Sequence, residues 1–136
     1  MTYETVQVQK LTGGCGAEVL GVDLNAMSNR QWGEVQRAFV EHGVIFFRDQ
    51  KLTPEQHIEF ARRWAPIDVN RFFKAAPGYP EIAEVRKEPE QKTNIGGGWH
   101  TDLSYLPEPP AFTILWAHDV PPYGGDTLWA NQCTAF

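Results

Sequence analysis

The sequence predicts an α+β fold, on three observations. Two segments, residues 29–42 and 54–64, begin with helix start signals and carry apolar side chains at helical spacing. Short apolar runs stand apart from these segments and have the length of β-strands. The 136 residues also include ten prolines and twelve glycines, which indicates many turns. A chain of this length is expected to form one domain with one core.

Both predicted helices have signals at each end. A hydroxyl residue caps the first turn, a glutamine three positions later completes a capping box, and a glycine or proline marks the end. For residues 29–42 these are Ser28, Gln31 and Gly43, and for residues 54–64 they are Thr53, Gln56 and Pro66. The second helix also has proline at its first position, where the missing N–H costs no hydrogen bond.

Five strands are expected around these helices. They are residues 6–11, 17–24, 44–47, 82–85 and 112–120. The last run, FTILWAHDV, is predicted to be the best-formed strand because it is long and rich in apolar and β-branched residues. The polar, glycine-rich stretch that precedes it is expected to form a loop.

Composition and charge exclude several classes of protein. Hydrophobic residues make up 42% and charged residues 21%, which is typical of a globular chain. The net charge of −5 argues against a nucleic-acid-binding surface. No apolar run has the length of a membrane span, and the N-terminus lacks the apolar core of a signal peptide. Cys15 and Cys133 make no disulfide framework. We therefore expect a cytoplasmic protein with no nucleic-acid or membrane partner.

Basic residues are unevenly distributed. All twelve Lys and Arg residues lie between Lys10 and Lys92, whereas residues 93–136 carry four acidic side chains and no basic one. Acidic side chains without a counter-charge in their own segment need a cation from elsewhere. An earlier basic residue, a metal ion or further chain would supply it.

The residues best suited to chemistry are His100 and Asp102, within the sequence WHTD. In an extended segment, side chains two positions apart face the same side, so an imidazole nitrogen and a carboxylate oxygen would lie together. This is two thirds of the two-His-one-carboxylate arrangement that binds iron(II) and leaves positions open for reactants. Taken alone, the pattern is a weak signal, and it favours a surface histidine and an aspartate that caps a turn.

The segments around this pair resemble one known family. The runs GGGWHTDLSYLPEPPAFTILWAHDVPPYGGDTLWAN, HGVIFFRDQKLTPEQHIEFARRW and GAEVLGVDL are similar to the taurine dioxygenase (TauD/TfdA) family of iron(II)- and 2-oxoglutarate-dependent oxygenases. The resemblance covers nearly the whole chain. It implies one domain over residues 1–136, truncated at its C-terminus. That domain would be the N-terminal part of a double-stranded β-helix (jelly-roll, clavaminate synthase-like) with flanking helices and an incomplete barrel.

The resemblance implies roles for three residues. His100 and Asp102 match the first histidine and the carboxylate that bind Fe(2+), and Thr127 matches the threonine that hydrogen-bonds the distal carboxylate of 2-oxoglutarate. The co-substrates would be 2-oxoglutarate and dioxygen, and the reaction would hydroxylate a small organic substrate such as a sulfonate, a sulfate ester or a similar acid. Family members are commonly oligomeric, so a homo-oligomer is an expected assembly.

Three positions are expected to contact the substrate. The family member that oxidises taurine has a His, a Tyr and an Asn there, and an ungapped alignment places Asn70, Phe73 and Gly96 at these positions. The replacements predict a substrate other than taurine.

The family also requires a second iron-binding histidine and an arginine that pairs with the oxoacid. After His100 this sequence has one histidine, His118, where the family has an ordinary strand residue, and it has no arginine. We therefore expect the chain to be inactive by itself. Two alternatives are a non-catalytic remnant or binding module of the same fold, and a zinc hydrolase, in which Thr127 would have no role.

Overall fold

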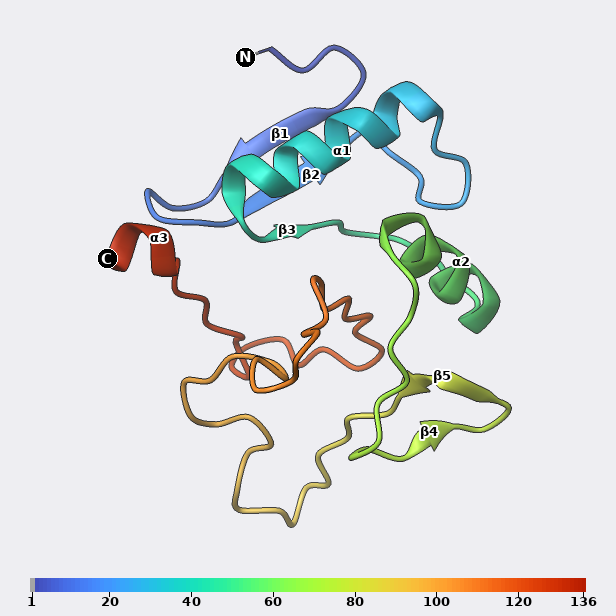
Figure 1. Cartoon of the computed structure of the whole chain (residues 1–136), viewed down its shortest axis with the longest axis vertical. Helices are drawn as coiled ribbons and strands as arrows, with labels where there is room; N and C mark the ends of the chain where they lie inside the picture. The colour runs from blue at the N-terminus through green and yellow to red at the C-terminus, as the bar shows by residue number, and fades with distance from the viewer. Residues whose placement is uncertain (1) are drawn as a thin grey trace. The chain divides into compact units, whose positions relative to one another are not determined.

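A computed structural model of the chain describes residues 2–136. Helices and short strands are both present, as the predicted α+β class requires, and within the described residues the strands form no closed barrel (Figure 1). The chain divides into two units, which we describe separately. One unit comprises the residues up to Leu52 together with His118–Phe136, and the other comprises Thr53–Ala117. Within residues 2–136, no helix has both the length and the apolar character needed to cross a bilayer.

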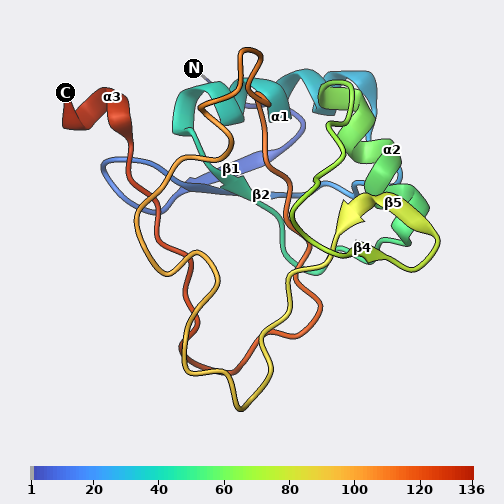
Figure 2. The same ribbon diagram turned by 60° about the horizontal axis from the view of Figure 1, so that its bottom comes forward.

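The first unit contains a three-stranded sheet in the order β1-β2-β3. β1 (Gln7–Lys10) pairs antiparallel with β2 (Ala17–Leu20), and β2 pairs parallel with β3 (Ile45–Phe46). Parallel neighbours need a crossover connection, which is supplied by α1 (Asn29–His42). Figures 1 and 2 both show α1 lying against this sheet. A short helix, α3 (Gln132–Ala135), lies at the end of the same unit.

The core of this unit lies between α1 and the sheet. Its buried apolar side chains are Val6, Ala17, Val19, Val35 and Ala38. Those from α1 lie one turn apart on one face of the helix, and those from β2 alternate along the strand. Each element therefore presents one apolar face to the other, and hydrophobic burial holds the two together.

Glu34 is a charged residue on this buried face of α1. Its carboxylate accepts hydrogen bonds from the backbone N–H groups of Glu4 and Thr5, each at 2.9 Å, and from that of Val6 at 3.1 Å. The Thr5 hydroxyl donates a further bond of 2.8 Å. These bonds, of which the one from Glu4 is the strongest influence, lower the pKa of Glu34 to about 2 although burial opposes them. The carboxylate thereby ties the segment before β1 to the helix.

The second unit is built on α2 (Pro54–Trp64), which packs on β5 (Tyr79–Ala83) of a hairpin. The other strand of that hairpin is β4 (Ala75–Ala76), and the two strands are antiparallel. Ile58 and Phe60 are the buried apolar residues of α2. On the surface, the Arg62 guanidinium lies 3.2 Å from the Glu81 carboxylate and links α2 to β5.

Both helices begin and end as the sequence predicts. The two capping boxes are formed, the first by Ser28 and Gln31 and the second by Thr53 and Gln56. Gly43 follows α1 with a φ of 72°, a left-handed conformation that glycine adopts without steric cost. Four predicted strands, over residues 6–11, 17–24, 44–47 and 82–85, overlap β1, β2, β3 and β5.

The strand predicted over residues 112–120 is wrong. It lies within residues 84–131, a stretch with no helix or strand that Figure 2 shows as a long irregular path. A strand needs a neighbour to complete its backbone hydrogen bonds. Among the described residues no segment pairs with this run, and Leu115 and Val120 stay 68% and 73% exposed.

Replacing Glu34 with glutamine should remove a stabilising contribution that depends on pH. The folded pKa of about 2 lies below the ordinary value of 4.5. The ionised carboxylate therefore stabilises the fold above about pH 4.5, and this contribution is lost as the pH falls toward 2. We expect the gap in urea midpoint between wild type and E34Q to narrow from pH 5 to pH 2. Near pH 3, unfolding of the wild-type protein should take up about one more proton than unfolding of E34Q.

Glu59, which is exposed on α2, provides the matched control. The difference in urea midpoint between E59Q and wild type should stay constant from pH 5 to pH 2. A gap between wild type and E34Q that stays constant from pH 5 to pH 2 would contradict this account of Glu34.

Candidate metal site

His100 and Asp102 lie together in the second unit. Nε2 of His100 is 3.4 Å from Oδ1 of Asp102. The two side chains are 57% and 51% exposed, so the pair is open to solvent. The side chains therefore meet as their two-residue spacing predicts, and their role as metal ligands stays a prediction.

The other polar atom of each side chain is held by a neighbour. Nδ1 of His100 lies 2.8 Å from the carbonyl oxygen of Gly98. A carbonyl oxygen can only accept, so Nδ1 is the donor in this contact. When the ring is neutral, its one proton is therefore on Nδ1 and Nε2 has a lone pair. Oδ2 of Asp102 accepts a 2.8 Å hydrogen bond from the Thr113 hydroxyl. The two atoms that face each other, Nε2 and Oδ1, are thus the ones left to bind a ligand.

Two aromatic contacts hold the segment around Thr113 against α2. The rings of Phe112 and Trp64 have centroids 5.2 Å apart. The Trp116 ring meets the His57 ring edge-on, at 5.9 Å. Edge-on and tilted ring pairs of this kind are favourable packing arrangements. Thr113 lies in the chain between these two residues that contact α2.

A tight turn follows Asp102. Leu103 has a φ of 48°, which is uncommon for a residue other than glycine, and its carbonyl accepts a 3.0 Å hydrogen bond from the N–H of Leu106. The hydroxyls of Thr101 and Ser104 lie 2.6 Å apart and add a bond across the same turn. These contacts limit how far the backbone on either side of Asp102 can move.

Gly96 lies directly beside His100. Its φ is 69°, and a Cβ at this position would lie 3.3 Å from Cε1 of the His100 ring. A larger residue would therefore be strained by its backbone and crowded by the imidazole. Gly96, one of the three positions predicted to contact substrate, thus borders the His100 ring.

The other predicted residues are placed differently. Oδ1 of Asn70 accepts hydrogen bonds from the backbone N–H groups of Phe72 and Phe73, at 2.8 and 3.0 Å, and so stabilises its own loop. Phe73 is 39% exposed. Thr127 belongs to the first unit, and its contact with 2-oxoglutarate stays a prediction.

The pair fits a divalent metal as part of a larger donor set. An imidazole nitrogen and a carboxylate oxygen are donors that iron(II) accepts. Two such donors on one metal, each at about 2.1 Å, lie about 3 to 4 Å apart, which includes the 3.4 Å between Nε2 and Oδ1. Within residues 2–136, no three His, Cys, Asp or Glu side chains gather closely enough to hold a metal.

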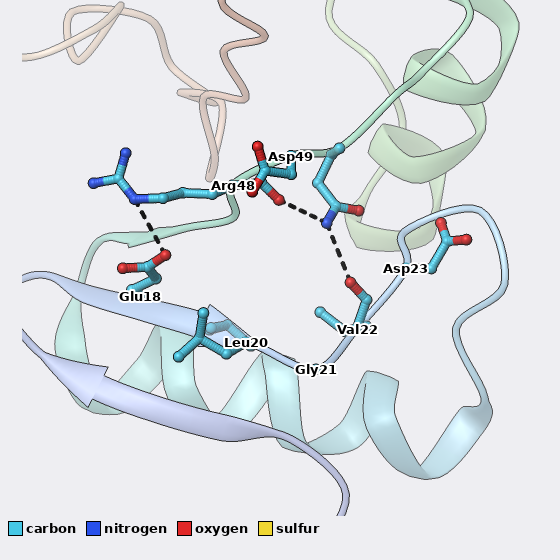
Figure 3. A pocket seen from close by; sticks show the side chains of 9 residues that line it. Glu18, Leu20, Gly21, Val22, Asp23, Arg48 and Asp49 are labelled. Atoms are coloured by element: carbon cyan, nitrogen blue, oxygen red, sulfur yellow. Dashed lines mark hydrogen bonds and ion pairs between the residues drawn. The ribbon is translucent and has the colours of Figure 1, made fainter.

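A separate pocket of about 430 Å³ lies in the first unit (Figure 3). It is lined by residues 18–23 and 48–50. Several of its polar groups have partners: Arg48 lies 3.2 Å from Glu18, and Gln50 accepts from the N–H of Leu24 and donates to the carbonyl of Val22. With no histidine or cysteine in its lining, the pocket is a weaker candidate than the His100–Asp102 pair.

Several known proteins are similar to this chain. A family model described as "Taurine catabolism dioxygenase TauD, TfdA family" matches residues 7–136. The chain is 28% identical to an alpha-ketoglutarate-dependent sulfonate dioxygenase of Saccharomyces cerevisiae, over 96% of this chain and 34% of that protein. It is 33% identical to an alkylsulfatase of Acinetobacter baylyi, over 98% of this chain and 42% of that protein.

A solved structure gives the same result. The crystal structure of a taurine dioxygenase from Burkholderia xenovorans matches with a TM-score of 0.65 and 30% identity, over 79% of this chain and 38% of that one. The chain spans less than half the length of each of these three relatives. Because the family model covers nearly all of its residues, the chain belongs to the TauD, TfdA family of dioxygenases.

Proposed function

We propose that the chain supplies two ligands, His100 and Asp102, to the iron(II) centre of a 2-oxoglutarate-dependent dioxygenase. The observation that carries this proposal is the 3.4 Å approach of Nε2 to Oδ1, with the other polar atom of each side chain already bonded elsewhere. Membership of the family supports the reaction class. When bound, iron(II) would use 2-oxoglutarate and dioxygen to oxidise a C–H bond of the substrate.

The chain's own residues would bind and orient the reactants. The Gly98 carbonyl keeps the His100 ring in the tautomer with a free Nε2. Asp102 brings a negative charge that a divalent cation neutralises, in a segment that has no basic residue. We assign to Thr127 the role of donating its hydroxyl to the distal carboxylate of 2-oxoglutarate, as the family resemblance implies.

The substrate that we propose is a small organic acid, either a sulfonate, a sulfate ester or a similar compound. Support comes from two relatives, one named a sulfonate dioxygenase and the other an alkylsulfatase. Gly96, Asn70 and Phe73 would contact the substrate, as the family resemblance implies. The phenyl ring of Phe73 would offer the substrate an apolar surface and no hydrogen-bonding group.

We also infer that residues 1–136 are part of one domain of the jelly-roll type. The match to a solved member over 79% of this chain supports it. In such a domain, further strands would pair with the segment that lacks a partner here.

Metal binding by the chain tests the proposal directly. Titration with cobalt(II), followed by visible absorption, should show weak binding by wild type, because two donors hold a divalent metal less firmly than three. H100A and D102A should each raise the Kd for cobalt(II) at least tenfold. Loss of a residue that only supports a ligand costs about tenfold or more, and loss of the ligand itself should cost no less. H118A, which removes an exposed histidine of the first unit, should bind like wild type. Equal binding by H100A, H118A and wild type would refute the assignment.

Turnover of 2-oxoglutarate should be absent for these 136 residues alone. The oxoacid carries two negative charges, and burying them requires a positive partner besides the metal. Residues 93–136 contribute a threonine hydroxyl and no Arg or Lys. With iron(II), ascorbate, 2-oxoglutarate and air, the succinate formed should equal that of an H100A control. Succinate clearly above that control would show that the chain completes its own site.

A further inference from the structure

The carboxylate of Asp102 has two oxygens that are chemically equivalent until a neighbour distinguishes them. Oδ1 faces Nε2 of His100 at 3.4 Å, and Oδ2 accepts the 2.8 Å hydrogen bond from Thr113. Rotation about the bond to the carboxylate would exchange the two oxygens or turn both away from His100. Because Asp102 is half exposed, packing alone does not prevent this rotation.

The hydroxyl of Thr113 is well placed to stop that rotation. Thr113 stands between Phe112 and Trp116, whose rings contact Trp64 and His57 of α2. The hydroxyl therefore comes from a part of the irregular stretch 84–131 that contacts a helix. A donor fixed in this way holds Oδ2 in one position and leaves Oδ1 directed at the histidine.

We propose that Thr113 is a positioning residue for the metal site: its hydroxyl, by bonding Oδ2 of Asp102, holds Oδ1 in place as the ligand atom. This inference rests on the proposed function, since it assumes that Asp102 binds a metal. The chemistry is general, because carboxylate ligands are commonly oriented by a hydrogen bond to the oxygen that does not bind the metal. Losing such a partner typically weakens metal binding 10- to 100-fold.

Three variants of the chain separate this role from packing. Thr113→Val keeps the shape of the side chain and removes the donor, whereas Thr113→Ser keeps the donor and removes a methyl group. Thr93→Val makes the same chemical change at an exposed threonine of the same unit. Thr113 is also exposed, so all three variants are expected to fold, and circular dichroism melting checks this.

Cobalt(II) alone is the probe. We expect T113V to raise the Kd for cobalt(II) by at least about tenfold and to change the visible absorption of the bound ion, because the carboxylate no longer has a fixed orientation. T113S should restore both the Kd and the spectrum, and T93V should match wild type throughout.

Two results would overturn the role of Thr113 and leave the proposed function standing. In one, T113V binds cobalt(II) with the wild-type Kd and spectrum while H100A has lost binding. In the other, T113S is impaired as much as T113V, which would assign the effect to packing. A wild-type chain that binds no cobalt(II) would instead overturn the proposed function, and this inference with it.

Discussion

Residues 84–131 contain no helix or strand, so no ladder of backbone hydrogen bonds fixes the positions of His100 and Asp102. Their arrangement depends on a few side-chain contacts instead. The Gly98 carbonyl fixes the histidine ring, and the Thr113 hydroxyl fixes the carboxylate. Thr113 in turn depends on α2, through the aromatic contacts on either side of it. The geometry of the His100–Asp102 pair therefore depends on these contacts.

The direct contact between His100 and Asp102 adds little stability by itself. Even with a protonated ring, a histidine and an aspartate that are both more than half exposed attract each other weakly, because water screens their charges. In the proposed site, a divalent cation would interact with both donors at once. The segment from residue 93 onward has four acidic residues and no basic one, so a bound cation would also supply a counter-charge that this segment lacks.

The sequence predicted those features that local signals determine. Helix boundaries follow from caps, and Ser28 and Thr53 mark the starts of α1 and α2. The approach of His100 to Asp102 follows from a spacing of two residues. Features that depend on distant partners were missed. The run of residues 112–120 has strand composition but lacks a neighbouring strand, and composition carries no information about neighbours.

Two residues illustrate the same limit for polar groups. Thr113 bonds a carboxylate 11 positions away, and nothing in the sequence around it signals that contact. Glu34 occupies the buried face of α1, where the helical pattern calls for an apolar side chain, because three backbone N–H groups from the start of the chain converge on it. In both cases the tertiary partner, and not the local pattern, determines the role of the residue.

The central claim is that His100 and Asp102 bind one metal ion together, and paramagnetic broadening by manganese(II) in NMR spectra tests it most directly. Substoichiometric manganese(II) should first broaden the ring signals of His100 and the amide signals of residues 100–103. In D102A, the same signals should broaden only at much higher manganese(II) concentration. Broadening of the His100 signals at the same manganese(II) concentration in wild type and D102A, or none at His100 in wild type, would contradict the claim.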